Sequence, residues 1–201
     1  MSSGLLDDWS NMKEEVINQM LDTGMDLVSK NGFNKLGLNE LVKNMGIPKG
    51  SFYYYFSSKD DFGLQVIDHY AGKSEQLLKS FLEDTSKTPK ERILTLFRHR
   101  IPVYEEQEYK EGCLLGNCSL ELSAQKEEFA IKIADRFDQW EHLFVKAIAE
   151  GQEDGSIKST YKAEVMAQFI LNSWEGAVLR MKSAKTNEAM EIFIRFVDDL
   201  L

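Results

Sequence analysis

The chain has 201 residues, a formal net charge of −9 at neutral pH and 43% hydrophobic residues, a length that suits a small domain joined to a larger one. No apolar run approaches the roughly 20 residues that span a bilayer, and the first residues lack the basic and apolar segments of a signal peptide. We therefore expect a cytoplasmic protein with no membrane partner. The only two cysteines, Cys113 and Cys118, exclude a disulfide framework.

Helical periodicity begins near the N-terminus and predicts an amphipathic first helix. Asn31-Gly32 ends this helix, since Gly32 can adopt the left-handed conformation that follows a helix C-terminus. A short second apolar stripe comes next, and Gly46-Ile47-Pro48 both stops it and allows a new helix to begin at Lys49. The stripe residues of the two helices are Val16, Ile17, Met20, Leu21, Gly24, Leu27 and Val28, then Leu38, Leu41, Val42 and Met45.

The pattern of the remaining sequence also predicts helices. Ser58-Lys59-Asp60-Asp61 predicts a capping box for a fourth helix that reaches Phe81 and links two domains. Thr88-Pro89 opens a fifth helix, and Pro102 is expected to kink or end it. The other predicted segments are Cys113–Ser123, an aromatic-rich helix from Phe129 that stops at Gly151 or Gly155, Lys162–Lys182 and Asn187–Leu201. With no strand pattern, the predicted fold is all-α, with about nine helices.

The acidic net charge argues against a nucleic-acid partner, because phosphate neutralisation drives such binding. The charge is unevenly distributed, however. From Lys30 to Lys59 the chain has five lysines and only Glu40 in opposition, a local net charge of +4. This segregation favours a DNA-binding region on an acidic body.

The segment Lys49–Phe56 has the properties of a helix that reads DNA. Phe52 and Phe56, at i and i+4, can anchor it to the core. The adjacent tyrosines cannot all face one small core, because successive helical positions diverge by about 100°, and Gly50 allows close backbone approach. The predicted DNA-contacting residues are Lys49, Gly50, Ser51, Tyr53, Tyr54, Tyr55 and Lys59.

These residues, together with Gly32-Phe33 and Leu38–Met45, resemble the DNA-binding domain of the TetR family of repressors over about Met12–Asp68. The resemblance implies DNA contacts by Lys49 and Tyr53, with mostly phosphate contacts by Tyr54, Tyr55 and Lys59. It also implies a helix-turn-helix domain at 1–58 and a sensor and dimerisation domain at 59–201, and a homodimer on a near-palindromic double-stranded operator. The last two helices would form the dimer interface. One departure is Leu36-Gly37, where the family often has a hydroxyl residue, so that Gly37 or Asn39 must cap the second helix.

The segment Glu111–Leu122 and the region around Trp174–Lys182 resemble the TetR subgroup that represses reductases for reactive electrophiles and chlorine species (N-ethylmaleimide reductase repressor-like). The resemblance implies that Cys113 is the sensor, with Lys182 a possible neighbour. A helix start at Gly112-Cys113 would lower the thiol pKa. The alternative for either cysteine is a small buried hydrophobic side chain, which we prefer for Cys118.

A second possibility for the body is a noncovalent pocket for an apolar or aromatic inducer. The same residues at helical spacing would equally suit an ordinary core. The sequence shows no phosphate loop, nucleophile elbow or metal-ligand spacing, so we expect neither an enzyme nor a cofactor nor a metal; a helical enzyme or interaction module is the remote alternative. The candidate pocket residues are Phe97, Tyr104, Tyr109, Trp140, Phe144, Met166, Phe169 and Trp174.

Overall fold

A computed structural model describes the backbone of residues 3–201 and the side chains of residues 12–48 and 50–201. The described chain is helical, with no strand, which confirms the predicted all-α class. The helices are α1 (Ser3–Asn31), α2 (Leu38–Asn44), the 3-10 helix η1 (Lys49–Ser51), α3 (Phe52–Tyr55), α4 (Lys59–Leu82), α5 (Pro89–Glu106), α6 (Leu114–Leu122), α7 (Glu127–Asp154), α8 (Ala163–Ala184) and α9 (Glu188–Leu200).

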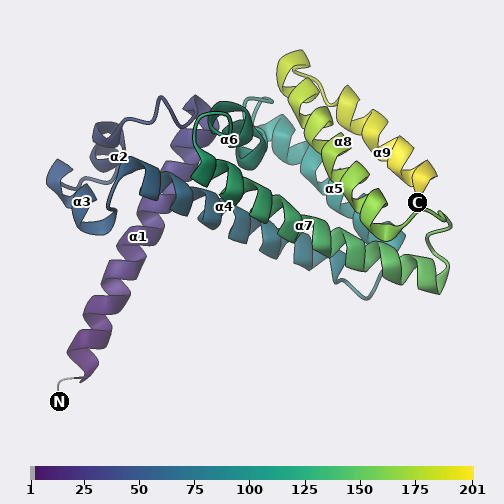
Figure 1. Cartoon of the computed structure of the whole chain (residues 1–201), viewed down its shortest axis with the longest axis horizontal. Coiled ribbons are helices and arrows are strands. Elements are labelled where there is room, and N and C mark those ends of the chain that lie inside the picture. Colours follow the sequence, from purple (N-terminus) through teal and green to yellow (C-terminus); the bar gives the residue numbers. More distant parts are fainter. Residues whose placement is uncertain (1–2) are drawn as a thin grey trace.

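The helices are arranged as a small head and a larger body (Figure 1). The head contains α1, α2, η1 and α3. The body contains α5 to α9, with α8 and α9 side by side at the end far from the N-terminus. Helix α4 packs against α1 in the head and against α5 and α7 in the body. It is therefore the element that both parts share, as the sequence predicted.

The core of the head is an aromatic cluster that includes the first turn of α4. Phe52, Phe56 and Phe62 are almost fully buried, and the ring centroids of Phe56 and Phe62 are 4.8 Å apart. Gly24 of α1 has no side chain where the Phe62 ring packs, and a Cβ there would collide with it. The short α3 is thus fixed to the longer helices by its apolar face.

The turns of the head follow the predicted pattern with two differences. Gly32 and Gly46 adopt positive φ angles of 81° and 66°. The new helix starts as η1 and becomes α-helical only at Phe52. At α4, the Ser58 hydroxyl accepts from the Asp61 N–H at 2.9 Å, but the Asp61 carboxylate accepts from Ser57, outside the helix. The expected reciprocal capping by Asp61 is therefore wrong.

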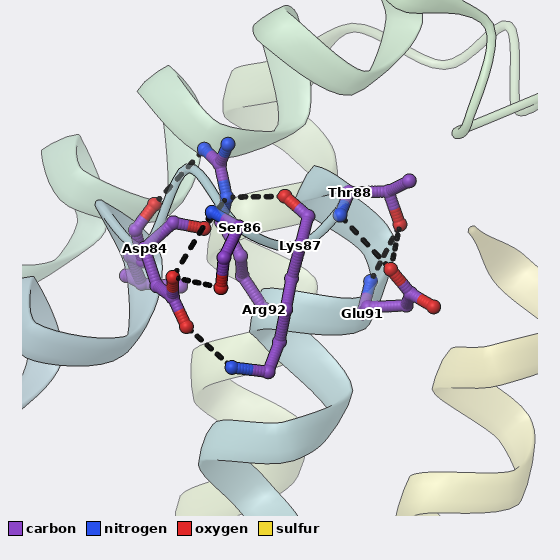
Figure 2. Close-up of polar contacts among 7 residues, drawn as sticks. Asp84, Ser86, Lys87, Thr88, Glu91 and Arg92 are labelled. Atoms are coloured by element: carbon purple, nitrogen blue, oxygen red, sulfur yellow. Dashed lines mark hydrogen bonds and ion pairs between the residues drawn. The ribbon is translucent and has the colours of Figure 1, made fainter.

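The turn between α4 and α5 is organised by Arg92, whose side chain is almost fully buried (Figure 2). Its Nε donates to the carbonyls of Asp84 and Lys87 at 2.8 and 2.9 Å, and its Nη1 donates to the Glu150 carboxylate at 2.9 Å. Thr88 and Glu91 cap the start of α5 reciprocally. The chain reversal thus depends on a buried guanidinium that is hydrogen-bonded through Nε and Nη1.

Of the two expectations for Pro102, a kink or an end of the fifth helix, the structure excludes the end. Helix α5 contains Pro102 and continues to Glu106. Pro102 cannot donate to the carbonyl of Arg98, yet both residues are exposed, so solvent can satisfy that carbonyl. Downstream, α7 ends at Gly155, with φ 80°, rather than at Gly151.

Candidate DNA-binding surface and sensor cavity

The head presents tyrosine side chains on the face of α3 opposite its core. Tyr53 and Tyr54 are 62% and 69% exposed, while Phe52 of the same helix is buried. Tyr55 is half-buried and packs edge-on against Tyr54, with 5.0 Å between ring centroids. Lys13 of α1 lies over the Tyr54 ring at 5.1 Å. Hydroxyl groups of α3 and a positive charge of α1 therefore face solvent together.

The start of this surface is backbone with free space above it. Gly50 is exposed, and nothing lies within 4 Å of the position that a Cβ would take. A phosphate or base edge can therefore approach closely. Ser51 is half-buried. Lys49 begins η1, but its side chain lies outside the described residues.

Lys59 has contacts within the protein that the sequence did not predict. Its Nζ donates to the Asn34 carbonyl at 3.2 Å and lies 5.0 Å from the Phe33 ring centroid. Burial and the nearby charge of Lys126 lower the pKa of Lys59. Lys59 therefore fixes the loop after α1.

The same loop is held by a carboxylate from the body. Glu121 of α6 accepts the backbone N–H groups of Phe33 and Asn34 at 2.8 and 2.7 Å. Its carboxylate lies against Gly32, where a Cβ would be 2.9 Å from Oε2. Glu121 was not among the predicted residues, because nothing in the local sequence indicates a partner so far away in the chain. This contact joins α6 directly to the head.

The body contains a cavity of about 70 Å³ between α4, α5, α7 and α8, which we call the inner cavity. Phe97 packs against Phe144 and Trp174, with centroids 5.7 and 4.9 Å apart. The predicted pocket residues that line this cavity are Phe97, Tyr104, Trp140, Phe144 and Trp174.

The other predicted pocket residues lie elsewhere. Phe169 is 56% exposed and faces α9 residues on the outer side of α8, and Met166 is buried beside Gln152. Tyr109 follows α5 in the loop before α6 and is also absent from the lining. The prediction is wrong for these three. Helix α8 has apolar residues on two faces, and periodicity alone did not show which face lines the cavity.

A larger opening of about 420 Å³, which we call the outer cleft, lies between α6, α7 and α8. Cys113, Leu171 and Glu175 line both the outer cleft and the inner cavity. Lys182 also lines the outer cleft, where its Nζ donates to the Asn117 side chain at 3.4 Å. The structure thus brings the predicted sensor Cys113 and its possible neighbour Lys182 to one opening.

Cys113 lies at the start of α6, as predicted, and its side chain caps that helix, but its thiol is not activated. Its Sγ accepts from the Gly116 N–H at 3.5 Å. Burial and the neighbouring Glu175 carboxyl raise the pKa of Cys113 well above its usual value, since both disfavour the thiolate. The expected lowering by the helix N-terminus is therefore wrong. Burial also raises the pKa of Cys118 to about 12.

Two further polar residues of this region were not predicted. The carboxyl of Glu175 points inward past Gly116, and burial raises its pKa to about 7. Arg100 of α5 lines the inner cavity beside Tyr104. Both are ionisable residues in helices with a strong apolar pattern, and that pattern gives no indication that they line a cavity.

The outer face of α8 and α9 is apolar and exposed. Phe196 and Ile192 of α9 are 70% and 39% exposed and line a shallow groove with Phe169 of α8. Such a contiguous apolar surface usually marks a protein interface. This face belongs to the last two helices, which the resemblance to the TetR family implies as the dimer interface.

Among the described residues, no helix combines the length and apolar character that crossing a membrane requires. The described side chains also include no group of three or more His, Cys, Asp and Glu residues placed to hold a metal ion. His69, for example, contacts Asp22 at 2.7 Å and so joins α4 to α1.

Comparison with known proteins decides the family. Residues 20–66 match the family described as bacterial regulatory proteins, tetR family, and residues 89–197 match the tetracyclin repressor-like, C-terminal domain. This chain belongs to the TetR family. Its family makes it a transcriptional repressor and not an enzyme. Regulators of this family bind DNA operators and typically act as dimers with small-molecule ligands.

Individual relatives cover nearly the whole chain. The transcriptional repressor DhaR of Mycobacterium sp. strain GP1 is 33% identical over 92% of this chain and 92% of its own length. The reduced form of Escherichia coli NemR has a TM-score of 0.85 at 27% identity, over 92% of this chain and 97% of that one. A TetR regulatory protein of Rhodobacter sphaeroides gives the same score and identity, covering 90% and 96%. The NemR match supports the predicted subgroup.

Proposed function

We propose that this TetR-family repressor binds a near-palindromic double-stranded operator as a homodimer and is released when a small molecule occupies the inner cavity. The observation that carries the DNA-binding half is the exposure of Tyr53 and Tyr54 on a helix whose other face is buried. An exposed side chain on a helix that is anchored by its other face is suited to contact a partner. Lys13 and the lysines of the 30–59 segment supply the charge for phosphates. In this proposal Lys49 to Ser51, Tyr53 to Tyr55 and Lys59 contact the operator.

The homodimer follows from the apolar face of α8 and α9. Phe169, Ile192 and Phe196 cannot be covered within one chain, and a two-fold interface would bury the same surface of both copies. A pair of heads related by such symmetry would read half-sites about one helical turn of DNA apart. The head would be residues 1–58 and the dimerising body residues 59–201.

Release requires contacts between cavity and head. Cys113 and Glu175 belong to the cavity wall, and Cys113 caps the helix from which Glu121 holds the loop at Phe33 and Asn34. Helix α4 provides a second connection, because it lines the cavity and packs in the head. A ligand that favours a body arrangement with the heads misplaced lowers operator affinity by its differential affinity for the two states.

The DNA-binding half is tested by a gel-shift assay with DNA from immediately upstream of the chain's own gene. Tyr54→Ala should weaken the complex roughly 10-fold through lost phosphate contact. Tyr161→Ala is the matched control, because Tyr161 is 64% exposed in the loop between α7 and α8 and should bind as the unaltered protein does. The absence of any complex at low salt would contradict the proposal.

A second candidate trigger is chemical modification of Cys113. It is favoured by the position of Cys113 at the wall between the outer cleft and the inner cavity, with Lys182 in the same cleft. Since the resting thiol is buried and protonated, its modification requires opening of the cleft. Treatment with N-ethylmaleimide should dissociate the Cys118→Ser variant from the operator, but not the Cys113→Ser variant. Unchanged release of Cys113→Ser would eliminate this trigger.

A further inference from the structure

Two arginines on α5 have opposite surroundings. The guanidinium of Arg92 donates to three backbone carbonyls and to the Glu150 carboxylate. Arg100, two turns later, has one hydrogen bond, from Nη2 to the Tyr104 hydroxyl at 3.5 Å. Among the described residues, no carboxylate forms an ion pair with Arg100, although a guanidinium has five N–H groups to satisfy.

The surroundings of Arg100 make this a costly arrangement for the protein alone. The guanidinium stacks on the Tyr104 ring, 5.0 Å from its centroid, at the wall of the inner cavity. Leu96, Phe97 and Trp174 supply apolar walls around the same space. A partly buried charge with unmatched donors disfavours the folded state unless something pairs with it.

The neutral polar groups nearby are suited to bind an anion with Arg100. Burial raises the pKa of both Tyr70 and Tyr104, so that each phenol remains protonated at neutral pH. The Tyr104 oxygen accepts from Arg100, which leaves its own O–H group free to donate into the cavity. A carboxylate can accept from such a hydroxyl and from the guanidinium at once.

We propose that the inner cavity binds a small organic monocarboxylate, whose carboxylate pairs with Arg100 and the Tyr104 hydroxyl and whose short apolar chain packs on Phe97 and Trp174. The volume of about 70 Å³ is several times the ~10–15 Å³ that one water occupies by the same kind of measure, which suits a chain of a few carbon atoms. The lining has one cation, Arg100, and one carboxyl group, Glu175, whose pKa burial raises to about 7. This charge balance favours a monoanion over a dianion. That this acid is also the inducer rests on the proposed function.

The test is a fluorescence titration, because Trp140 and Trp174 line the inner cavity and report on its occupancy. Butyrate is compared with butyramide, which has a similar shape and no charge, and with inorganic phosphate. The variants are Arg100→Met and Arg100→Gln. The control is Arg98→Met, since Arg98 is exposed on the same helix and contacts Asp198 from 3.9 Å. Operator binding is followed in parallel by fluorescence anisotropy.

The expected result is saturable binding of butyrate at least 10-fold tighter than that of butyramide or phosphate. Both Arg100 variants should weaken it at least 10-fold, while Arg98→Met changes it less than 2-fold. Equal binding of butyramide, undiminished binding to a folded Arg100 variant, or no butyrate binding would overturn the proposal. Butyrate binding without operator release would support the carboxylate site while refuting the inducer role in the proposed function.

Discussion

The head and the body of this protein use aromatic residues for different purposes. In the head, Phe52, Phe56 and Phe62 form a closed cluster, and the neighbouring Tyr53 and Tyr54 are left in solvent. In the body, aromatic rings surround an inner cavity that also contains a charged group. The head is therefore a rigid support for an exposed surface. The body has internal space, and in our proposal a ligand in that space changes the arrangement of the body.

The largest expected effect comes from breaking the shared element between the two regions. Phe62→Ala removes a fully buried ring of α4 from the head cluster, and should lower the free energy of unfolding by about 3–5 kcal/mol. The measurement is urea denaturation followed by circular dichroism. The matched variant Phe62→Leu keeps most of the apolar volume and should cost much less. A loss below about 1 kcal/mol for Phe62→Ala would show that α4 does not unite head and body.

The second-largest expected effect tests whether the apolar face of α8 and α9, and not another part of the body surface, forms the proposed dimer interface. Phe196→Glu places a charge in the apolar face of α8 and α9, where burying it unpaired costs several kcal/mol. We expect a monomer by analytical ultracentrifugation, with operator affinity reduced at least about 100-fold. Ile131→Glu, at an equally exposed apolar position of α7, should remain dimeric. Dimerisation of Phe196→Glu would place the interface elsewhere.

The contribution of Glu175, in the cavity wall of the body, to the free energy of unfolding should depend on pH. The pKa of Glu175 is raised from 4.5 to about 7, so the folded state retains a proton that the unfolded state loses first. Its contribution destabilises the fold as pH rises from about 4.5 to 7, and the penalty is complete above 7. The free energy of unfolding of Glu175→Gln, relative to that of the unaltered protein, should therefore increase by roughly 1–3 kcal/mol as pH rises from 4.5 to 8. A pH-independent difference in urea denaturation would contradict this.

The smallest effect tests a single hydroxyl of the head. Tyr53→Phe keeps the exposed ring and removes one hydrogen bond to DNA, which is worth about 0.5–1.5 kcal/mol. Operator affinity measured by anisotropy should fall roughly 2- to 10-fold, with an unchanged unfolding midpoint. Tyr161→Phe, with the same change on an exposed tyrosine of the body, should alter neither. An equal loss in both variants would exclude a specific contact by Tyr53.

The head was predictable because its signals are local. The i, i+4 spacing of Phe52 and Phe56 and the positive φ angles of Gly32 and Gly46 are properties of short segments. The cap by Glu121 was missed because its partners, Phe33 and Asn34, lie 87–88 residues away in the chain. A pattern within a short segment cannot indicate a contact between residues so far apart in the chain.

The body was predicted correctly in its helices and less well in its chemistry. The helix start at Cys113 was right, but its pKa is set by burial and by Glu175 from α8. Phe169 was assigned to the wrong face of α8, because both faces are apolar. The exposed apolar face of α8 and the face that lines the cavity produce the same helical period. Only the packed structure separates them.

The most direct test of the DNA-binding account is the operator affinity of the unaltered protein and of the double variant Tyr53→Ala/Tyr54→Ala, measured by anisotropy from 50 to 200 mM salt. We expect the affinity of the unaltered protein to fall steeply with salt, as phosphate binding requires. The double variant should bind roughly 30- to 100-fold more weakly at each salt concentration, with the same unfolding midpoint. Equal affinity of the two proteins would contradict the assignment of the exposed tyrosine face to DNA.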